Sequence, residues 1–170
     1  MGVEAHRKAS RGLVRFGIVS ISDSRTVHED FSGDKAQKMI TEGGHLLVSR
    51  TLIQDEPDQL AWALRTLSGY VDAALLIGGT GISPRDSTYD TLRGLYLKEL
   101  LGFGELFRQM SFNQIGQAAI LSRASAGVFM DMLIVSLPGS IRAIELALKD
   151  ILLPEVGHML YETRKSGPLG

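Results

Sequence analysis

Apolar and polar positions along this chain alternate between a strand-like and a helix-like period. Short apolar runs of strand length lie at 14–21, 45–53, 73–77, 127–130 and 132–137. The segments between them carry apolar residues at helical spacing, which predicts helices. Strands that alternate with helices through short turns are typical of an α/β sandwich with a mostly parallel sheet.

The starts of the helices are predicted from residues that commonly cap or open a helix. Ser32 and Ser140 are the capping serines, and Pro57 stands in the first turn of the second helix. Glu105 would open a helix after a turn made by two glycines, where it could be only a favourable first-turn charge. Pro154 would separate a last short helix from the one before it.

The stretch 75–86, LLIGGTGISPRD, links the third strand to the next helix. Its glycines can adopt positive φ and allow a ligand to approach their N–H groups, and Thr80 adds a hydroxyl group. Helix-capping residues follow at Asp86, Ser87 and Thr88. Unpaired N–H groups at the start of that helix would favour an anion, such as phosphate. The glycines of this turn are Gly78, Gly79 and Gly81.

The same stretch also has a purely structural interpretation. Glycines after a strand often form only a tight connection, and Arg85 beside Asp86 is commonly a solvated ion pair. No lysine follows the glycines, and their spacing differs from GxGxxG. A P-loop ATPase is therefore not indicated.

Other polar turns also fall at predicted strand ends, where ligands bind in parallel α/β folds. They are SDSR at Ser22 to Arg25, the junction at Asp55, and LPGS at 137–140. We expect one mouth formed by these turns and the glycine turn. Asp55 could instead be a helix cap, and Arg123 could be either a solvated side chain or an anion clamp.

Composition limits the classes of function. The chain has 170 residues, of which 44% are hydrophobic and 22% charged, as expected for one globular domain. A net charge of -1 gives no overall attraction to nucleic acid or to an anionic membrane. The absence of cysteine excludes disulfides, thiolate catalysis and cysteine-ligated metal sites.

We expect a single domain at 13–165, a basic N-terminal arm at 1–12 and a short tail at 166–170. No apolar stretch reaches the roughly 20 residues that a membrane-spanning helix needs. The N-terminal region also lacks the apolar segment of a signal peptide. A cytoplasmic location without a membrane partner is the expectation.

The motifs GGTGISPRDST, GFGELFR, LSRASAG and SLPGS resemble, in this order and spacing, the molybdenum cofactor biosynthesis proteins of the MoaB and MogA type. The resemblance extends from about 14 to 158. It implies a three-layer α/β/α molybdopterin-binding fold that assembles as a trimer or as a dimer of trimers. It also implies that molybdopterin is the substrate and that Mg-ATP adenylylates its terminal phosphate before metal insertion.

The resemblance assigns roles residue by residue. Asp55 and Asp86 match the two functional aspartates of the family, and we expect them to orient Mg²⁺ and the reacting phosphates, with no tightly bound metal. The residues expected to bind substrate or nucleotide are Ser22, Asp23, Ser24, Arg25, Gly78, Gly79, Thr80, Gly81, Arg85, Thr88, Glu105, Ser122, Arg123, Pro138, Gly139 and Ser140. Departures from the family pattern lie at turn edges, at Phe31, Tyr89, Asp90, Leu101 and Ile141.

Two functions stay open at this point. One is a molybdopterin adenylyltransferase, and the other is a non-catalytic molybdopterin-binding carrier or scaffold in the same pathway. The presence of both aspartates favours the enzyme. The expected partners are molybdopterin, ATP and further copies of this chain, while other proteins of the pathway are compatible partners and nucleic acid is not.

Overall fold

A six-stranded mixed sheet forms the centre of the molecule, in the order β2-β1-β3-β6-β5-β4. Strands β2, β1, β3 and β6 run parallel, and β5 is antiparallel to both of its neighbours. The strands are β1 (Arg15–Ile21), β2 (Leu46–Ile53), β3 (Ala73–Ile77), β4 (Lys98–Glu99), β5 (Ser125–Phe129) and β6 (Met132–Leu137). The prediction of a mostly parallel sheet is confirmed. The short β4 was not predicted, because two residues carry no periodic pattern.

The computed structural model describes residues 12–165. Almost all of the predicted N-terminal arm and the whole predicted tail at 166–170 therefore lie outside the described residues. Within 12–165, no helix is both long enough and apolar enough to cross a membrane.

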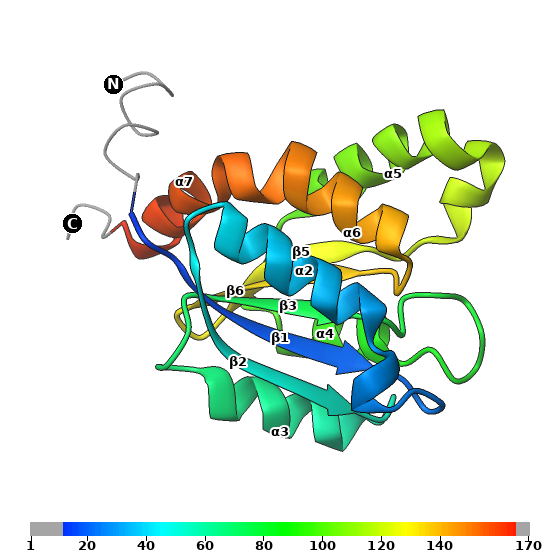
Figure 1. The fold of residues 1–170 in the computed structure, drawn as a ribbon, viewed down its shortest axis with the longest axis horizontal. Coiled ribbons are helices and arrows are strands. Elements are labelled where there is room, and N and C mark those ends of the chain that lie inside the picture. Colours follow the sequence, from blue (N-terminus) through cyan, green and yellow to red (C-terminus); the bar gives the residue numbers. More distant parts are fainter. Residues whose placement is uncertain (1–11, 166–170) are drawn as a thin grey trace.

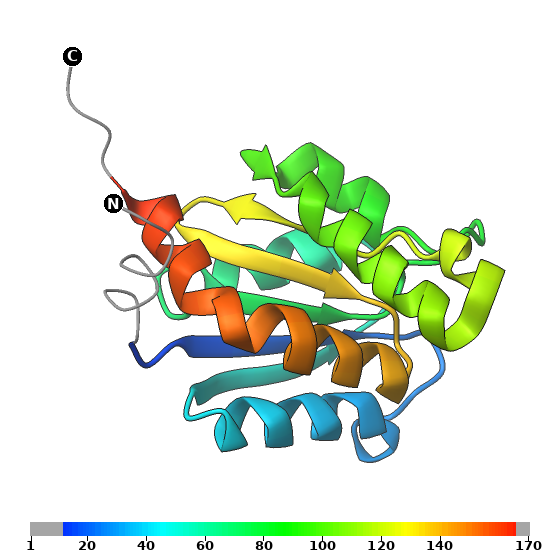
Figure 2. The same cartoon turned by 90° about the horizontal axis from the view of Figure 1, so that it is seen from above.

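Helices cover both faces of the sheet, as Figures 1 and 2 show. One face carries α2 (Phe31–Glu42), α5 (Leu101–Ile115), α6 (Ile141–Ala147) and α7 (Leu153–Arg164). The other carries α3 (Pro57–Leu67) and α4 (Thr88–Leu95). An apolar cluster fills each interface, and every residue of β3 is buried. The chain is thus a three-layer α/β/α sandwich.

Helix α2 begins differently from the prediction. Its N-cap is Asp30, whose carboxylate accepts a hydrogen bond from the Gly33 N–H at 3.0 Å. Ser32 lies inside the helix, and its hydroxyl donates to the Gly139 carbonyl at 2.7 Å. The prediction of Ser32 as the cap was wrong, and this serine instead connects α2 to the turn after β6.

Helix α5 begins at Leu101 rather than at Glu105. Gly104 lies inside the helix, where a Cβ would come 2.7 Å from the Ala124 carbonyl oxygen. The glycine therefore permits close packing of the helix on the segment that enters β5. It does not form the turn that was predicted.

The helical conformation continues through the region around Pro154. Helix α6 continues through one π-helical turn, η3 (Leu148–Leu152), directly into α7. Pro154 occupies the first turn of α7, where a missing N–H costs little. The predicted last helix thus begins at Leu153, beside Pro154 as expected, but a π turn and not a break in the helix joins it to α6. Two short 3-10 turns, η1 (Val27–Glu29) and η2 (Gly116–Leu121), complete the fold.

Candidate functional site

A pocket of about 330 Å³ opens at the carboxyl ends of β3 and β6, where it is bounded by α5 and α6. The polar turns after the two strands form one wall, and one face of α5 with the first turns of α6 forms the other. The predicted site residues that line this pocket are Gly79, Thr80, Gly81, Asp86, Ser122, Pro138, Gly139 and Ser140. Of the four polar turns that we expected in one mouth, two line this pocket, the glycine turn and the turn at 137–140, whereas the turn at Ser22 to Arg25 and the junction at Asp55 do not.

The glycine turn has the backbone geometry that its sequence predicts. Gly78 and Gly79 have φ values of 120° and 63°. A Cβ on Gly78 would collide with the Ile21 carbonyl, and one on Gly79 would collide with the Asp55 carboxylate and the Thr88 hydroxyl. Within residues 12–165, the N–H groups of Gly79, Thr80 and Gly81 donate to no protein acceptor. These amides are available to an anion in the pocket.

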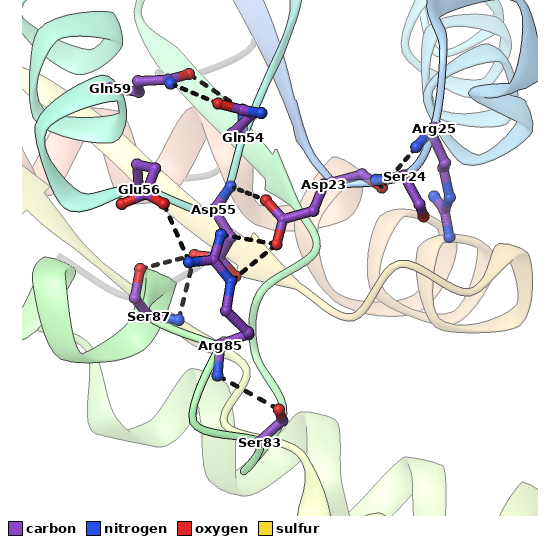
Figure 3. Close-up of polar contacts among 11 residues, drawn as sticks. Asp23, Ser24, Arg25, Gln54, Asp55, Glu56, Gln59, Ser83, Arg85 and Ser87 are labelled. Atoms are coloured by element: carbon purple, nitrogen blue, oxygen red, sulfur yellow. Dashed lines mark hydrogen bonds and ion pairs between the residues drawn. The ribbon is translucent and has the colours of Figure 1, made fainter.

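Ser87, at the start of α4, holds the Asp55 side chain in place, and Asp55 is not a helix cap. Its side chain accepts hydrogen bonds at Oδ1 from the Ser87 N–H at 3.2 Å and from the Ser87 hydroxyl at 2.7 Å, as Figure 3 shows. The N-cap of α3 is Glu56. Asp55 is only 8% exposed, and its Oδ2 lies against Gly79. Its carboxylate therefore supports the glycine turn from outside the pocket lining.

Thr88 is buried beside Asp55. Its side chain is fully buried, and Oγ1 has no hydrogen-bond partner among the described residues. Thr88 Oγ1 and Asp55 Oδ2 both lie where a Gly79 Cβ would be. A buried hydroxyl without a partner costs about 1–3 kcal/mol, so this hydroxyl is a candidate for a functional role rather than a stabilising one.

Asp86 is the predicted catalytic residue that lines the pocket. Its Oδ2 accepts a hydrogen bond from the Ser83 N–H at 3.0 Å and lies 2.6 Å from the position of a Gly81 Cβ. Its Oδ1 has no hydrogen-bond partner within residues 12–165. Asp86 at Gly81 and Asp55 at Gly79 thus flank the glycine turn, and only Asp86 faces the pocket.

Arg123 holds the glycine turn in place. Its guanidinium donates to the carbonyls of Gly81 and Asp86, both at 2.8 Å, and to the Asp90 carboxylate at 2.7 Å. Its backbone N–H also donates to the Thr80 carbonyl at 3.0 Å. Arg123 is therefore not the solvated side chain that the sequence left open, and the groups that it clamps belong to the protein.

Arg85 forms an exposed bridge across the strand ends (Figure 3). Its guanidinium donates to the Asp23 carboxylate at 2.8 and 3.0 Å and to the Glu56 carboxylate at 3.1 Å. The bond from Arg85, helped by the Asp55 N–H, lowers the pKa of Asp23. Asp23 and Glu56 in turn raise the pKa of Arg85. Arg85 connects three of the predicted turns, and the carboxylates of Asp23 and Glu56 neutralise its charge.

The first turn and the last turn meet through Arg25. The Ser22 hydroxyl accepts hydrogen bonds from the N–H groups of Ser24 and Arg25. This fold of the loop brings Arg25 Nη2 within 3.4 Å of the Gly139 carbonyl. Arg25 makes no ion pair with a described carboxylate, so its charge remains available beside the pocket rim.

Glu105 is the predicted residue that the structure does not bring to the site. It is exposed on α5 and lines none of the pockets around that helix. Conversely, sequence reasoning missed Phe107, Ser111 and Gln114 on α5, and Arg142 in the first turn of α6. The sequence offered one signal for a functional residue here, which was Arg142. A cation in the first turn of a helix, such as α6, opposes the helix dipole.

Magnesium would have few protein ligands here. No group of three or more histidine or carboxylate side chains within residues 12–165 is placed to hold a metal ion. Mg²⁺ that arrives with a nucleotide needs only one or two carboxylates, because phosphates and water supply its other ligands. The Oδ1 of Asp86 and the Oδ2 of Asp55 are oxygens of the required type.

Comparisons with known proteins show the family of this chain and agree with its fold. A family model described as a probable molybdopterin binding domain matches residues 17–158. Molybdenum cofactor biosynthesis protein B of Halalkalibacterium halodurans is 45% identical over 168 residues, covering 97% of this chain and 99% of that protein.

Solved structures give the same result. A crystal structure of molybdenum cofactor biosynthesis protein B has a TM-score of 0.85 and 39% identity, covering 91% of this chain and 98% of that one. The tungsten cofactor synthesizing protein MoaB from Pyrococcus furiosus has a TM-score of 0.82 and 31% identity, covering 90% of this chain and 98% of that one.

Proposed function

The chain belongs to the family of the probable molybdopterin binding domain, with molybdenum cofactor biosynthesis proteins B as its relatives, and we propose that it adenylylates molybdopterin with Mg-ATP. The observation that carries the proposal is the pocket wall in which Asp86 stands beside the unpaired N–H groups of the glycine turn. Such a wall suits a phosphate that must be bound and oriented.

The reaction joins two anions. A terminal phosphate oxygen of molybdopterin attacks the α-phosphorus of ATP, the bond to the β-phosphate oxygen breaks, and pyrophosphate leaves. Bound Mg²⁺ would neutralise phosphate charge. The amides of Gly79, Thr80 and Gly81 would hold phosphate oxygens, and Asp86 would orient the reacting groups. No general base is needed, because a phosphate is already ionised at neutral pH.

The remaining predicted residues have supporting parts in this proposal. Asp55 would position the glycine turn and contribute a ligand to the metal when the nucleotide is bound. Arg25 would add positive charge at the rim, and Arg123 would keep the turn rigid. Ser140 caps α6 by accepting from the Ala143 N–H at 3.2 Å, and its own N–H would face the substrate.

We also propose that the protein works as a homo-oligomer.

A second candidate is a carrier that binds molybdopterin without turnover. It is favoured by the position of Asp55, which leaves Asp86 as the single carboxylate that residues 12–165 contribute to the pocket lining. Incubation with molybdopterin and Mg-ATP separates the two functions. The enzyme must yield adenylylated molybdopterin and pyrophosphate in equal amounts, whereas a carrier binds the pterin and yields neither.

The role of Asp86 gives the first mutational prediction. Asp86→Ala should lower turnover by orders of magnitude and leave molybdopterin affinity nearly unchanged, because the carboxylate acts on the reacting groups. Single-turnover kinetics and pterin titration measure the two quantities. Asp58→Ala, which removes an exposed carboxylate on α3, is the matched control. An equal loss of pterin affinity in Asp86→Ala would show instead that this residue shapes the pocket.

A further inference from the structure

Asp30 is a buried carboxylate that the proposed chemistry does not use. The residue is only 2% exposed and is the N-cap of α2. Its Oδ2 accepts hydrogen bonds from the Ser20 hydroxyl at 2.5 Å and from Arg50 at 2.9 Å, and its Oδ1 accepts from the Gly33 N–H at 3.0 Å. A buried charge is tolerated only where such partners compensate it. Partners on β1, β2 and α2 therefore hold this carboxylate in one place.

The cluster around Asp30 fixes the first turn of α2. Arg50 also donates to the Asp30 carbonyl at 2.9 Å and to the Asp34 carboxylate at 2.6 Å. A Cβ on Gly33 would collide with the Asp30 carboxylate, so the glycine lets the helix lie close against the cluster. Ser32 stands in the same turn and is only 4% exposed. Its position is thereby set by the cluster.

Ser32 links this first turn to a wall of the pocket. Its hydroxyl donates to the Gly139 carbonyl at 2.7 Å, and α2 lies beside α6 (Figures 1 and 2). The other donor to this carbonyl, Arg25 Nη2, is 3.4 Å away and makes a weaker bond. Gly139 lines the pocket, whereas α2 contributes no residue to the lining within 12–165. Ser32 therefore reaches a bound molecule through the turn that contains Gly139.

A fixed carbonyl fixes the peptide group to which it belongs. The peptide bond between Gly139 and Ser140 is planar, so the bond from Ser32 sets the orientation of this whole group in the pocket wall. Glycine has access to many backbone conformations, and the turn at 137–140 would lose a constraint without that bond. A substrate that must first order its binding wall binds more weakly, because ordering costs conformational entropy.

We propose that Ser32 is a positioning residue for this pocket: it holds the turn at 137–140 in the conformation that binds substrate, and Asp30 holds Ser32. The inference rests on the proposed function and gives the Asp30 cluster a part in substrate affinity. The turn contacts the substrate in the ground state and in the transition state alike, so its loss of order should appear in KM and not in kcat.

Kinetics of the full chain with molybdopterin and Mg-ATP, at a temperature at which every variant is folded, test this role. Ser32→Ala should raise the KM for molybdopterin about fivefold, as expected for one neutral hydrogen bond, and leave kcat nearly unchanged. The Ala143 N–H, which donates to the Ser140 hydroxyl, should undergo faster hydrogen–deuterium exchange in this variant. Lys35→Met is the matched control, because it breaks the ion pair between α2 and Glu145 of α6 and should change neither quantity.

A double-variant cycle tests whether Asp30 acts through Ser32. Asp30→Asn can keep the cap at Oδ1 but places an amide group where Ser20 and Arg50 donate, so it should raise KM in the same way. Asp30→Asn combined with Ser32→Ala should raise KM no further than the larger single effect. If Asp30→Asn does not fold, Ser20→Ala takes its place in the cycle, because it removes only one donor to Oδ2.

The proposal would be overturned by an unchanged KM or unchanged Ala143 exchange in Ser32→Ala, by an equal rise of KM in Lys35→Met, or by effects that multiply in the double variant. Titration with molybdopterin in the absence of ATP measures affinity without turnover. A wild-type chain that binds molybdopterin and yields no adenylylated product would refute the proposed enzyme alone, and the dissociation constants of the variants would then decide the positioning role. A wild-type chain that binds no molybdopterin would refute both.

Discussion

At the scale of single residues, Thr88 is a buried hydroxyl that stability alone does not explain. Thr88→Val removes a donor without a described partner, so the free energy of unfolding should stay the same or rise by about 1 kcal/mol. Turnover should fall at least tenfold, because the hydroxyl faces the glycine turn beside Asp55. Urea unfolding and steady-state kinetics measure these effects.

Two variants give this prediction its controls. Thr88→Ser keeps the hydroxyl and should restore most of the activity. Ser136→Ala removes the other fully buried hydroxyl that has no partner among the described residues, but Ser136 lies within β6 and not in the glycine turn or beside Asp55. It should leave turnover unchanged. If Thr88→Val retained full turnover, the hydroxyl would have no part in the reaction.

Some residues of the site could be predicted from the sequence, and others could not. Asp86 and the glycine turn could be predicted, because the glycines and the caps are adjacent in the chain. Ser111 and Gln114 could not, because polar residues on an amphipathic helix are usually solvent-facing. Only the packing of α5 beside α6 turns Ser111 towards the pocket. The partners of Arg85 and Arg123 are likewise far away in sequence and follow from the fold alone.

At the scale of elements, an ion-pair cluster around the buried Asp72 carboxylate fastens α7 to the amino-terminal end of the sheet. The Asp72 carboxylate accepts from the Arg15 N–H at 2.8 Å, from the Arg15 guanidinium at 3.1 Å and from Arg164 at 2.6 Å. Burial alone would raise the pKa of Asp72, but the bonds from Arg15 and Arg164 outweigh it and lower the pKa to about 2.

This cluster predicts a pH dependence of stability. Because the folded-state pKa of Asp72 lies below its usual value, its contribution is complete above about pH 4 and is lost as the pH falls towards 2. Both arginines are about half exposed, so screening reduces the contribution to about 1–2 kcal/mol. Asp72→Asn should lose this amount at pH 7 and flatten the decline between pH 4 and 2. Urea unfolding at pH 7 and between pH 4 and 2 measures these effects, with Asp58→Asn as the control. If Asp72→Asn and Asp58→Asn behaved alike, the predicted contribution of Asp72 would be contradicted.

Elements with one clear period were predictable, and elements with mixed signals were not. The apolar runs of β3 and β6 were predicted at the residues where the structure has them. The start of α5 was missed because two glycines resemble a turn, whereas Gly104 serves contact with Ala124. The continuation of α6 into α7 was missed because a proline ordinarily ends a helix, and the π turn that tolerates it has no simple sequence signature.

At the scale of the whole molecule, the outer face of α5 is unusually apolar for a monomer. Leu101 and Phe112 share one face of the helix and are 66% and 53% exposed, and Ile120 in η2 is 76% exposed. Glu105 and Arg108 lie at helical spacing on the same face. Exposed apolar groups that gather in this way mark association surfaces. Glu105, which lies away from the pocket, would then belong to a subunit contact rather than to substrate binding.

The expected assembly is a trimer or a dimer of trimers, and Leu101→Glu should reduce its mass towards that of the monomer. Glutamate is favourable at the first position of a helix, so the change should not unfold α5, but it would place a charge in the proposed contact. Trp62→Glu alters an equally exposed apolar side chain on α3, on the opposite face of the sheet, and should leave the mass unchanged. Size-exclusion chromatography with light scattering measures both. A monomeric wild-type chain, or dissociation caused by Trp62→Glu and not by Leu101→Glu, would show that the outer face of α5 is not the contact.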